Sequence, residues 1–186
     1  MDTCNEISFS AGERRQIIDY LRKLLANLTG VDNREPEMPE IAALKKEGSC
    51  FITLRTDGLL RGCIGNSVPF ESLGRNLKRN LLNAAAADPV LPPIEAGEVE
   101  DVEIEVSILS RPAKITDCTT IVPGRDGVVL RVGNRISAFL PQIAAARNWD
   151  RETLLDNLAS KLGMEPGIWR TPEAELLTFR TEVFSG

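Results

Sequence analysis

Residues 49–65 constrain the fold more than any other part of the chain, because they read SCFITLRTDGLLRGCIG. Two apolar runs stand on either side of Asp57-Gly58, and an Asp-Gly pair in that position is a strong local signal for a β-hairpin. A two-residue loop there would place Ile52 opposite Cys63, and it would put Cys50 on the face that Cys63 occupies. A hairpin joins two antiparallel strands. The sequence therefore predicts an antiparallel sheet that contains this segment.

The rest of the chain alternates between helical and strand patterns. Residues 11–28 carry apolar side chains at helical spacing, and Ser10 with Glu13 forms the capping-box pattern that starts a helix. Two hairpins without a regular strand–helix–strand repeat favour an α+β fold with a mainly antiparallel β-sheet flanked by helices. The other expected elements are helices over 41–46, 69–86 and 150–163, a strand over 101–109, a hairpin over 127–141 and a last strand over 176–183.

The chain has 186 residues, which is the length of one ordinary domain. The proline-rich segment 88–98 is the best place for a boundary between two lobes of such a domain. The first residues lack the basic and apolar regions of a signal peptide. No apolar run approaches the ~18 residues that a membrane helix needs. We therefore expect a cytoplasmic protein without a membrane segment.

Histidine is absent from the sequence, and this removes the commonest hydrolytic chemistries. Without it the chain cannot build a Ser-His-Asp triad, a Cys-His pair or a His-Glu-x-x-His zinc site. The cysteines at 4, 50, 63 and 118 are scattered, which fits reduced thiols rather than a zinc site. The sequence predicts no metal site, and it points to no particular cofactor, so the cofactor stays unknown. A net charge of −5 argues against broad binding to nucleic-acid phosphates.

Several segments, taken in order, resemble one known family. The hexapeptide LRGCIG stands intact at Leu60–Gly65, and VEIEVSILS and GVVLRVGNRISAFLPQIA follow it further along the chain. Together these motifs resemble the AMMECR domain family, also called AmmeMemoRadiSam system protein A. The resemblance implies a single two-lobed AMMECR-type domain over residues 1–186. One motif departs from the family pattern: Val90-Leu91 stands where the family commonly has Arg-Phe, so this loop lacks that arginine.

The resemblance also implies a setting for the function. In microbes such proteins occur beside a radical-SAM protein and a Memo-like protein. We therefore expect a component of a modification system, with these two proteins as partners and the LRGCIG hairpin as its site. The family supplies no established reaction or cofactor, so the substrate and the reaction stay open. The alternatives are a non-catalytic scaffold or binding partner of that system and, less favoured by the charge, a nucleic-acid-associated regulator.

Cys63 is the first candidate for chemistry, with Arg61 two residues before it. Alternate residues of a strand share a face, so both side chains are expected on one side of the hairpin. A reactive thiolate at Cys63 would draw its positive potential from Arg61 and from the start of the next helix. The neighbouring Gly62 and Gly65 would let a ligand approach closely. The competing interpretation is a small buried apolar residue, since free cysteine is among the most buried residue types.

Weaker candidates lie elsewhere in the chain. Glu105 and Ser107 share the polar face of the strand over 101–109 and could do acid–base work, although a solvated sheet face is the ordinary explanation. Gln142 follows the end of a strand and could donate to a ligand. Three basic residues on the helix over 69–86 could contact phosphates, although such a run is more often a solvated helix face: Arg75, Lys78 and Arg79.

Overall fold

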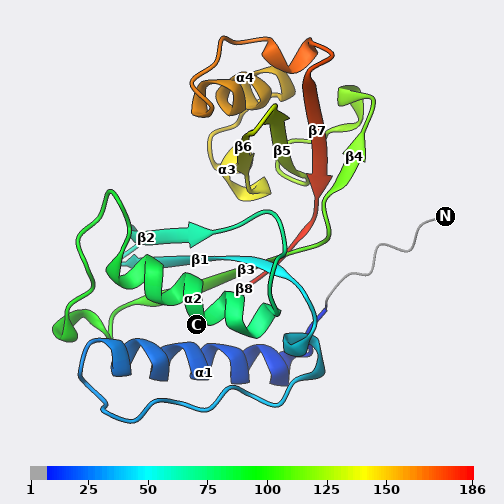
Figure 1. Ribbon diagram of the computed structural model, residues 1–186. Helices are drawn as coiled ribbons and strands as arrows, with labels where there is room; N and C mark the ends of the chain where they lie inside the picture. The colour runs from blue at the N-terminus through cyan, green and yellow to red at the C-terminus, as the bar shows by residue number, and fades with distance from the viewer. Residues whose placement is uncertain (1–7) are drawn as a thin grey trace. The chain divides into compact units, whose positions relative to one another are not determined.

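The computed structural model describes residues 8–186, and these fall into two compact units (Figure 1). The first unit contains the chain up to Ile108 together with Glu182–Gly186, and the second contains Leu109–Thr181. The segment 88–98, which the sequence suggested as a lobe boundary, lies inside the first unit, and the chain crosses between the units after Ile108 and after Thr181. None of the helices in the described residues is long and apolar enough to cross a bilayer.

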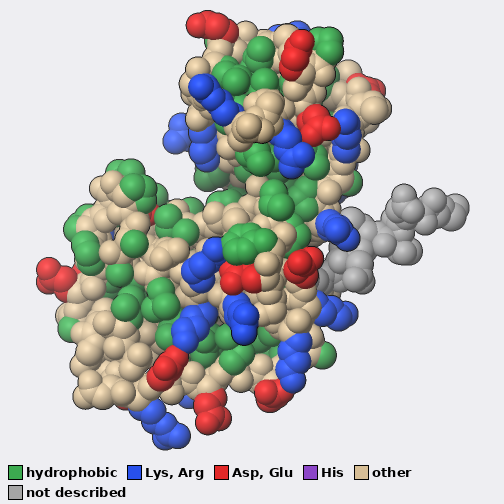
Figure 2. Space-filling view, viewed as in Figure 1, with side chains coloured by type: hydrophobic (Ala, Val, Ile, Leu, Met, Phe, Trp, Pro, Cys, Tyr) green, Lys and Arg blue, Asp and Glu red, His purple; other side chains and the backbone are tan. Residues whose placement is uncertain are grey.

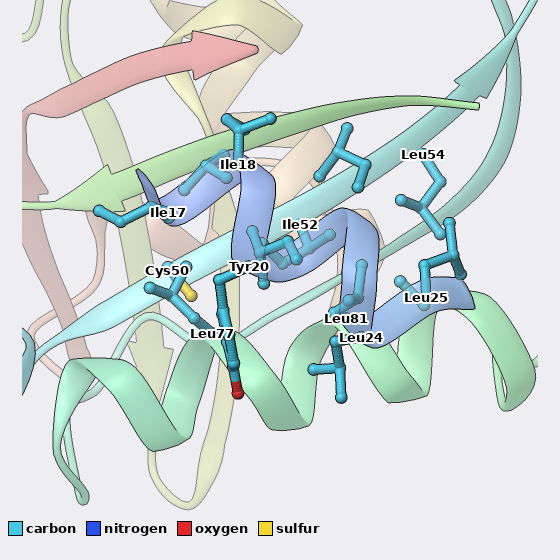
Figure 3. Packing of buried hydrophobic residues seen from close by; sticks show 14 of the residues in the cluster. Ile17, Ile18, Tyr20, Leu24, Leu25, Cys50, Ile52, Leu54, Leu77 and Leu81 are labelled. Atoms are coloured by element: carbon cyan, nitrogen blue, oxygen red, sulfur yellow. The ribbon is translucent and has the colours of Figure 1, made fainter. Parts of the chain in front are cut away.

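The first unit is a four-stranded sheet packed with two helices (Figure 1). Its elements are α1 Ala11–Leu28, β1 Ser49–Thr56, β2 Leu59–Gly65, α2 Leu73–Ala86, β3 Glu103–Leu109 and β8 Thr181–Ser185, with the 3-10 helices η1 Ala42–Lys45 and η2 Ala96–Glu98. The strands lie in the order β2-β1-β3-β8, so β2 is an edge strand. Side chains from α1, α2, β1 and β3 form one buried apolar cluster (Figure 3).

The starts of the two helices follow from the residues that precede them. The Ser10 backbone N–H donates to the Glu13 carboxylate at 2.8 Å, and the Glu13 N–H donates to the Ser10 hydroxyl at 3.3 Å, so the predicted capping box is confirmed. Helix α2 begins at Leu73, later than the predicted position 69. The reason is that Ser72 is extended and forms a β-bridge with Glu47, which keeps the preceding segment out of the helix.

The second unit has its own sheet and its own buried cluster. Its elements are β4 Ala113–Ile115, β5 Gly127–Val132, β6 Arg135–Phe139, α3 Pro141–Ala146, α4 Arg151–Lys161 and β7 Ala174–Phe179, with the 3-10 helices η3 Cys118–Thr120 and η4 Ile168–Arg170. The strand order is β4-β7-β5-β6, and leucines of α4 belong to the same buried cluster as residues of β5. The sequence missed β4 and α3, because elements this short show no clear periodicity.

The last predicted strand, over 176–183, is in fact two strands, β7 and β8, that belong to two different sheets. Arg180 separates them, and its backbone exchanges hydrogen bonds with Ser110: the Ser110 N–H donates to the Arg180 carbonyl at 2.9 Å, and the Arg180 N–H donates to the Ser110 hydroxyl at 2.9 Å. The apolar pattern over residues 176–183 is continuous, so the sequence did not show the break at Arg180. The predicted class nevertheless holds: the fold is α+β with mainly antiparallel sheets flanked by helices.

Candidate functional site

The predicted β1–β2 hairpin forms, but its register differs from the expected one. Cys63 lies opposite Thr53, Gly62 lies opposite Leu54, and Arg61 has no partner in the ladder. The extra residue is a β-bulge, which shifts the pairing by one position on the side of the bulge away from the turn. The prediction that Ile52 faces Cys63 was therefore wrong, because it assumed a regular ladder.

The shift changes which residues share a face. Cys50, Ile52 and Leu54 are 0% exposed and belong to the cluster formed with α1 and α2 (Figure 3). Thr53 alternates with these residues along β1, so it lies on the opposite face of the sheet. The Cys63 sulfur is 3.4 Å from the Thr53 hydroxyl oxygen, which puts Cys63 on this second face. The expectation that Cys63 shares a face with Cys50 was wrong.

The two cysteines of the hairpin consequently have different environments. Cys50 is buried, and burial raises the pKa of its thiol to about 12, although the Asn80 amide hydrogen bond lowers it in part. Cys63 is only partly buried. Both are free thiols, as is Cys118 in the second unit, while Cys4 lies outside the described residues. Because Cys50 and Cys63 point to opposite faces, the strand geometry opposes a disulfide between them.

Arg61 is bound to an acidic residue of the segment that follows α2. Its Nε donates to Glu98 Oε1 at 2.7 Å and its Nη2 donates to Glu98 Oε2 at 2.8 Å, which is a bidentate ion pair. The same guanidinium donates to the carbonyls of Pro92 at 3.2 Å and Pro93 at 3.3 Å. The hydrogen bonds from Arg61 lower the pKa of Glu98 to about 2, and Glu98 in turn raises the pKa of Arg61. Arg61 thus carries a charge that Glu98 already balances.

Asp88 joins the same segment to β2 at a second point. Its carboxylate accepts hydrogen bonds from the backbone N–H groups of Cys63 at 3.1 Å, Val90 at 2.9 Å and Leu91 at 3.2 Å. Partial burial on its own raises the pKa of Asp88, but these three donors outweigh it and the pKa is lowered overall. Asp88 was not among the predicted site residues, although an Asp before a proline is a known signal for a side chain that organises its own loop. We call Arg61, Asp88 and Glu98 the hairpin clamp.

A cluster of side-chain amides holds the other end of β2. Asn76 and Asn80 of α2 are 0% and 2% exposed, and Asn66 follows the last residue of β2. Asn76 Oδ1 accepts from the Cys50 backbone N–H at 2.9 Å, Asn80 Nδ2 donates to the Cys50 carbonyl at 2.9 Å, and Asn76 Nδ2 donates to Asn66 Oδ1 at 2.7 Å. We call Asn66, Asn76 and Asn80 the amide cluster. The sequence analysis missed it, although two asparagines at i and i+4 on the apolar side of a helix are a visible signal.

Comparison with known proteins decides the family. The AMMECR1 family model matches residues 18–184, which is most of the chain. The chain belongs to the AMMECR1 family. The resemblance suggested by the LRGCIG hexapeptide is thereby confirmed.

Similar AMMECR1 proteins come from archaea. A Methanothermobacter thermautotrophicus protein is 31% identical over 184 residues, with 94% of this chain and 95% of that one covered. A Methanopyrus kandleri protein is 30% identical over 177 residues, with 90% and 86% covered. The crystal structure of an uncharacterized Pyrococcus horikoshii protein superimposes with a TM-score of 0.82 at 27% identity, covering 91% of this chain and 89% of the other. None of these names states a reaction, so the role of the hairpin in this AMMECR1 protein must be argued from its geometry.

The two glycines of the hexapeptide are explained by close packing within the first unit. A Cβ on Gly62 would lie 2.1 Å from the carbonyl oxygen of Ala84 in α2, so only glycine lets β2 approach the helix this closely. A Cβ on Gly65 would lie 2.2 Å from the Phe51 ring. The space beside each glycine is already filled by the protein itself.

The weaker candidates come from both units of the chain. Glu105 is half-buried and Ser107 is 1% exposed in β3, where they alternate with core residues of the first unit. Gln142 lies in α3 of the second unit. Within the described residues, no group of three or more Cys, Asp or Glu side chains is placed to hold a metal ion.

The basic residues of α2 are largely paired. Lys78 forms an ion pair with Glu35, and Arg79 forms one with Glu71 at 3.1 Å while its guanidinium lies 4.4 Å from the centre of the Phe70 ring. Arg75 is exposed. The helix therefore does not present three free cations on one side.

Proposed function

We propose that this AMMECR1 protein is a component of a modification system that also contains a radical-SAM protein and a Memo-like protein, and that the β1–β2 hairpin is its contact site. The proposal places the system in the cytoplasm, where free thiols such as Cys63 stay reduced. The family membership and the intact hexapeptide at Leu60–Gly65 support it.

The observation that carries the proposal is the hairpin clamp. It fastens β2 to residues 88–98 through a bidentate ion pair and through backbone hydrogen bonds, so that the two segments form one preformed surface. Arg61 is used to build that surface, and its charge is balanced by Glu98. This arrangement favours contact with a partner over activation of a thiol by Arg61.

A second candidate function is catalysis or group transfer by Cys63. The observation in its favour is that Cys63 is a free, partly exposed thiol on the face of the sheet opposite the helices, with the Thr53 hydroxyl 3.4 Å away. A catalytic thiol reacts with iodoacetamide at about pH 6.5, where an ordinary free cysteine is almost fully protonated. The nucleic-acid interpretation loses support, because Lys78 and Arg79 are paired with acidic residues.

The test compares three proteins purified from the native host: wild type, Cys63→Ser and Arg61→Ala. We expect the radical-SAM and Memo-like proteins to co-purify with wild type and with Cys63→Ser, and to be lost or strongly reduced with Arg61→Ala. Circular dichroism checks that Arg61→Ala is folded. If neither protein accompanies wild type, the proposal is wrong. If both are lost with Cys63→Ser and the intact mass of wild type shows an adduct on Cys63, the catalytic candidate replaces it.

A further inference from the structure

The tip of the hairpin and the loop after α2 expose apolar side chains that no other part of the first unit covers. Leu59 is 72% exposed, Leu60 46% and Val90 85%. Arg61 binds the carbonyl of Pro92, so residues 89–93 lie beside the start of β2. In Figure 2 hydrophobic side chains gather over this part of the first unit. We call Leu59, Leu60 and Val90 the tip patch, and clustered exposed apolar residues of this kind mark interaction surfaces.

The two chain segments that carry the tip patch are rich in acidic residues. Residues 55–61 and 88–103 together contain seven acidic residues and two arginines. The charge of Arg61 is balanced by Glu98, which leaves Arg55 as the other cation of these segments. The exposed acidic residues are Asp57, Glu95, Glu100, Asp101 and Glu103. An apolar centre with an acidic rim complements a surface that has an apolar centre and a basic rim.

The patch is also held in place before any partner arrives. The hairpin clamp fixes the loop through Asp88, which accepts the Val90 N–H, and through Arg61, which binds the carbonyls of Pro92 and Pro93. Three prolines, Pro89, Pro92 and Pro93, restrict the loop backbone further. A surface that is already ordered loses little conformational entropy on binding, so its apolar area contributes more fully to affinity.

We propose that the tip patch is the docking surface for a protein partner whose own surface has an apolar centre ringed by lysine and arginine. This inference rests on the proposed function, since it takes the radical-SAM or the Memo-like protein as that partner. The acidic rim decides against the other large ligands: it repels nucleic-acid phosphates and the anionic surface of a membrane.

Binding of the two purified partner proteins, measured by calorimetry or biolayer interferometry, tests this. We expect Leu59→Ser with Val90→Ser to weaken binding of one partner by about tenfold or more. Val31→Ser is the matched control, because Val31 is 54% exposed in the first unit outside the patch, and it should change the affinity by less than about twofold. All these side chains are exposed, so the thermal midpoints should stay close to that of wild type.

The charge of the rim is tested separately. Glu100→Lys with Asp101→Lys should weaken binding by about tenfold, whereas Glu37→Lys, exposed outside the rim, should not. Wild-type affinity should fall by about fivefold or more between about 50 and 300 mM salt.

If wild type binds but the patch and rim variants bind equally well, this inference is overturned and the proposed function stands. If wild type binds neither protein, both are overturned. Binding of wild type to DNA, or to vesicles rich in phosphatidylserine, through the patch would also overturn it.

Discussion

The two ends of strand β2 are fixed in different ways. At its start Arg61 forms a charged, partly exposed ion pair with Glu98, with side chains that are 16% and 30% exposed. At its end Asn66 meets Asn76 and Asn80, two neutral side chains that are almost completely buried. The charged end depends on the protonation of a carboxylate, and the amide end does not. The amide end of β2 is therefore part of the buried core, whereas the charged end holds a surface segment in place.

The largest effect is expected at the amide end. Asn76→Ala removes the acceptor of the Cys50 N–H and the donor to Asn66, and it leaves a buried backbone N–H without that partner. We expect the free energy of unfolding to fall by about 2–4 kcal/mol, with no dependence on pH between about 5 and 8. Urea denaturation measures it.

Asn83→Ala is the matched control, because Asn83 lies on the same helix and is only partly buried. It should change the free energy of unfolding by less than about 1 kcal/mol. Equal losses for the two variants would show that the cost comes from the helix and not from the amide cluster.

The amide cluster is a part of the structure that the sequence did not predict. The capping box of α1, the two hairpins and the antiparallel α+β class were predictable, since each depends on local patterns of residues. Asn76 and Asn80 were not assigned a role, because their partners Cys50 and Asn66 come from other elements. Hydrogen bonds between segments that are distant in the sequence produce no periodic pattern of residues, so they cannot be predicted from such patterns.

The predicted register of the hairpin was wrong for a related reason. Asp57-Gly58 identified the turn, but the bulge at Arg61 depends on what lies beyond the strand pair. Gly62 packs against the Ala84 carbonyl of α2, and Arg61 reaches Glu98 of a later segment. Among the predicted site residues, Arg61 forms an ion pair with Glu98, an acid that the sequence did not single out.

The clamp end should show an intermediate effect that depends on pH. Glu98 has its pKa lowered from 4.5 to about 2 in the folded protein. A carboxyl whose pKa is lowered by folding stabilises the protein above its unfolded pKa, and it loses this contribution as the pH falls towards the folded value. We expect Glu98→Gln to lower the free energy of unfolding by about 1–3 kcal/mol at pH 7.

The pH profile distinguishes this anchor from the amide end. The difference between wild type and Glu98→Gln should shrink as the pH falls from about 5 to about 3, whereas the difference for Asn76→Ala should persist until the protein unfolds in acid. Glu100→Gln, at an exposed neighbouring position, is the control and should show little difference at any pH. A constant difference for Glu98→Gln across this range would mean that its ion pair with Arg61 does not stabilise the fold.

The smallest effect is expected between the two ends, at Cys63. The residue is partly exposed and its sulfur lies 3.4 Å from the Thr53 hydroxyl oxygen, so a serine hydroxyl at this position can bond to Thr53. Cys63→Ser should therefore change the free energy of unfolding by less than about 1 kcal/mol. Cys50→Ser places a hydroxyl at a completely buried position and should cost about 1–3 kcal/mol. Equal losses from the two substitutions would show that Cys63 is a core residue like Cys50, and the case for a functional thiol in this hairpin would end there.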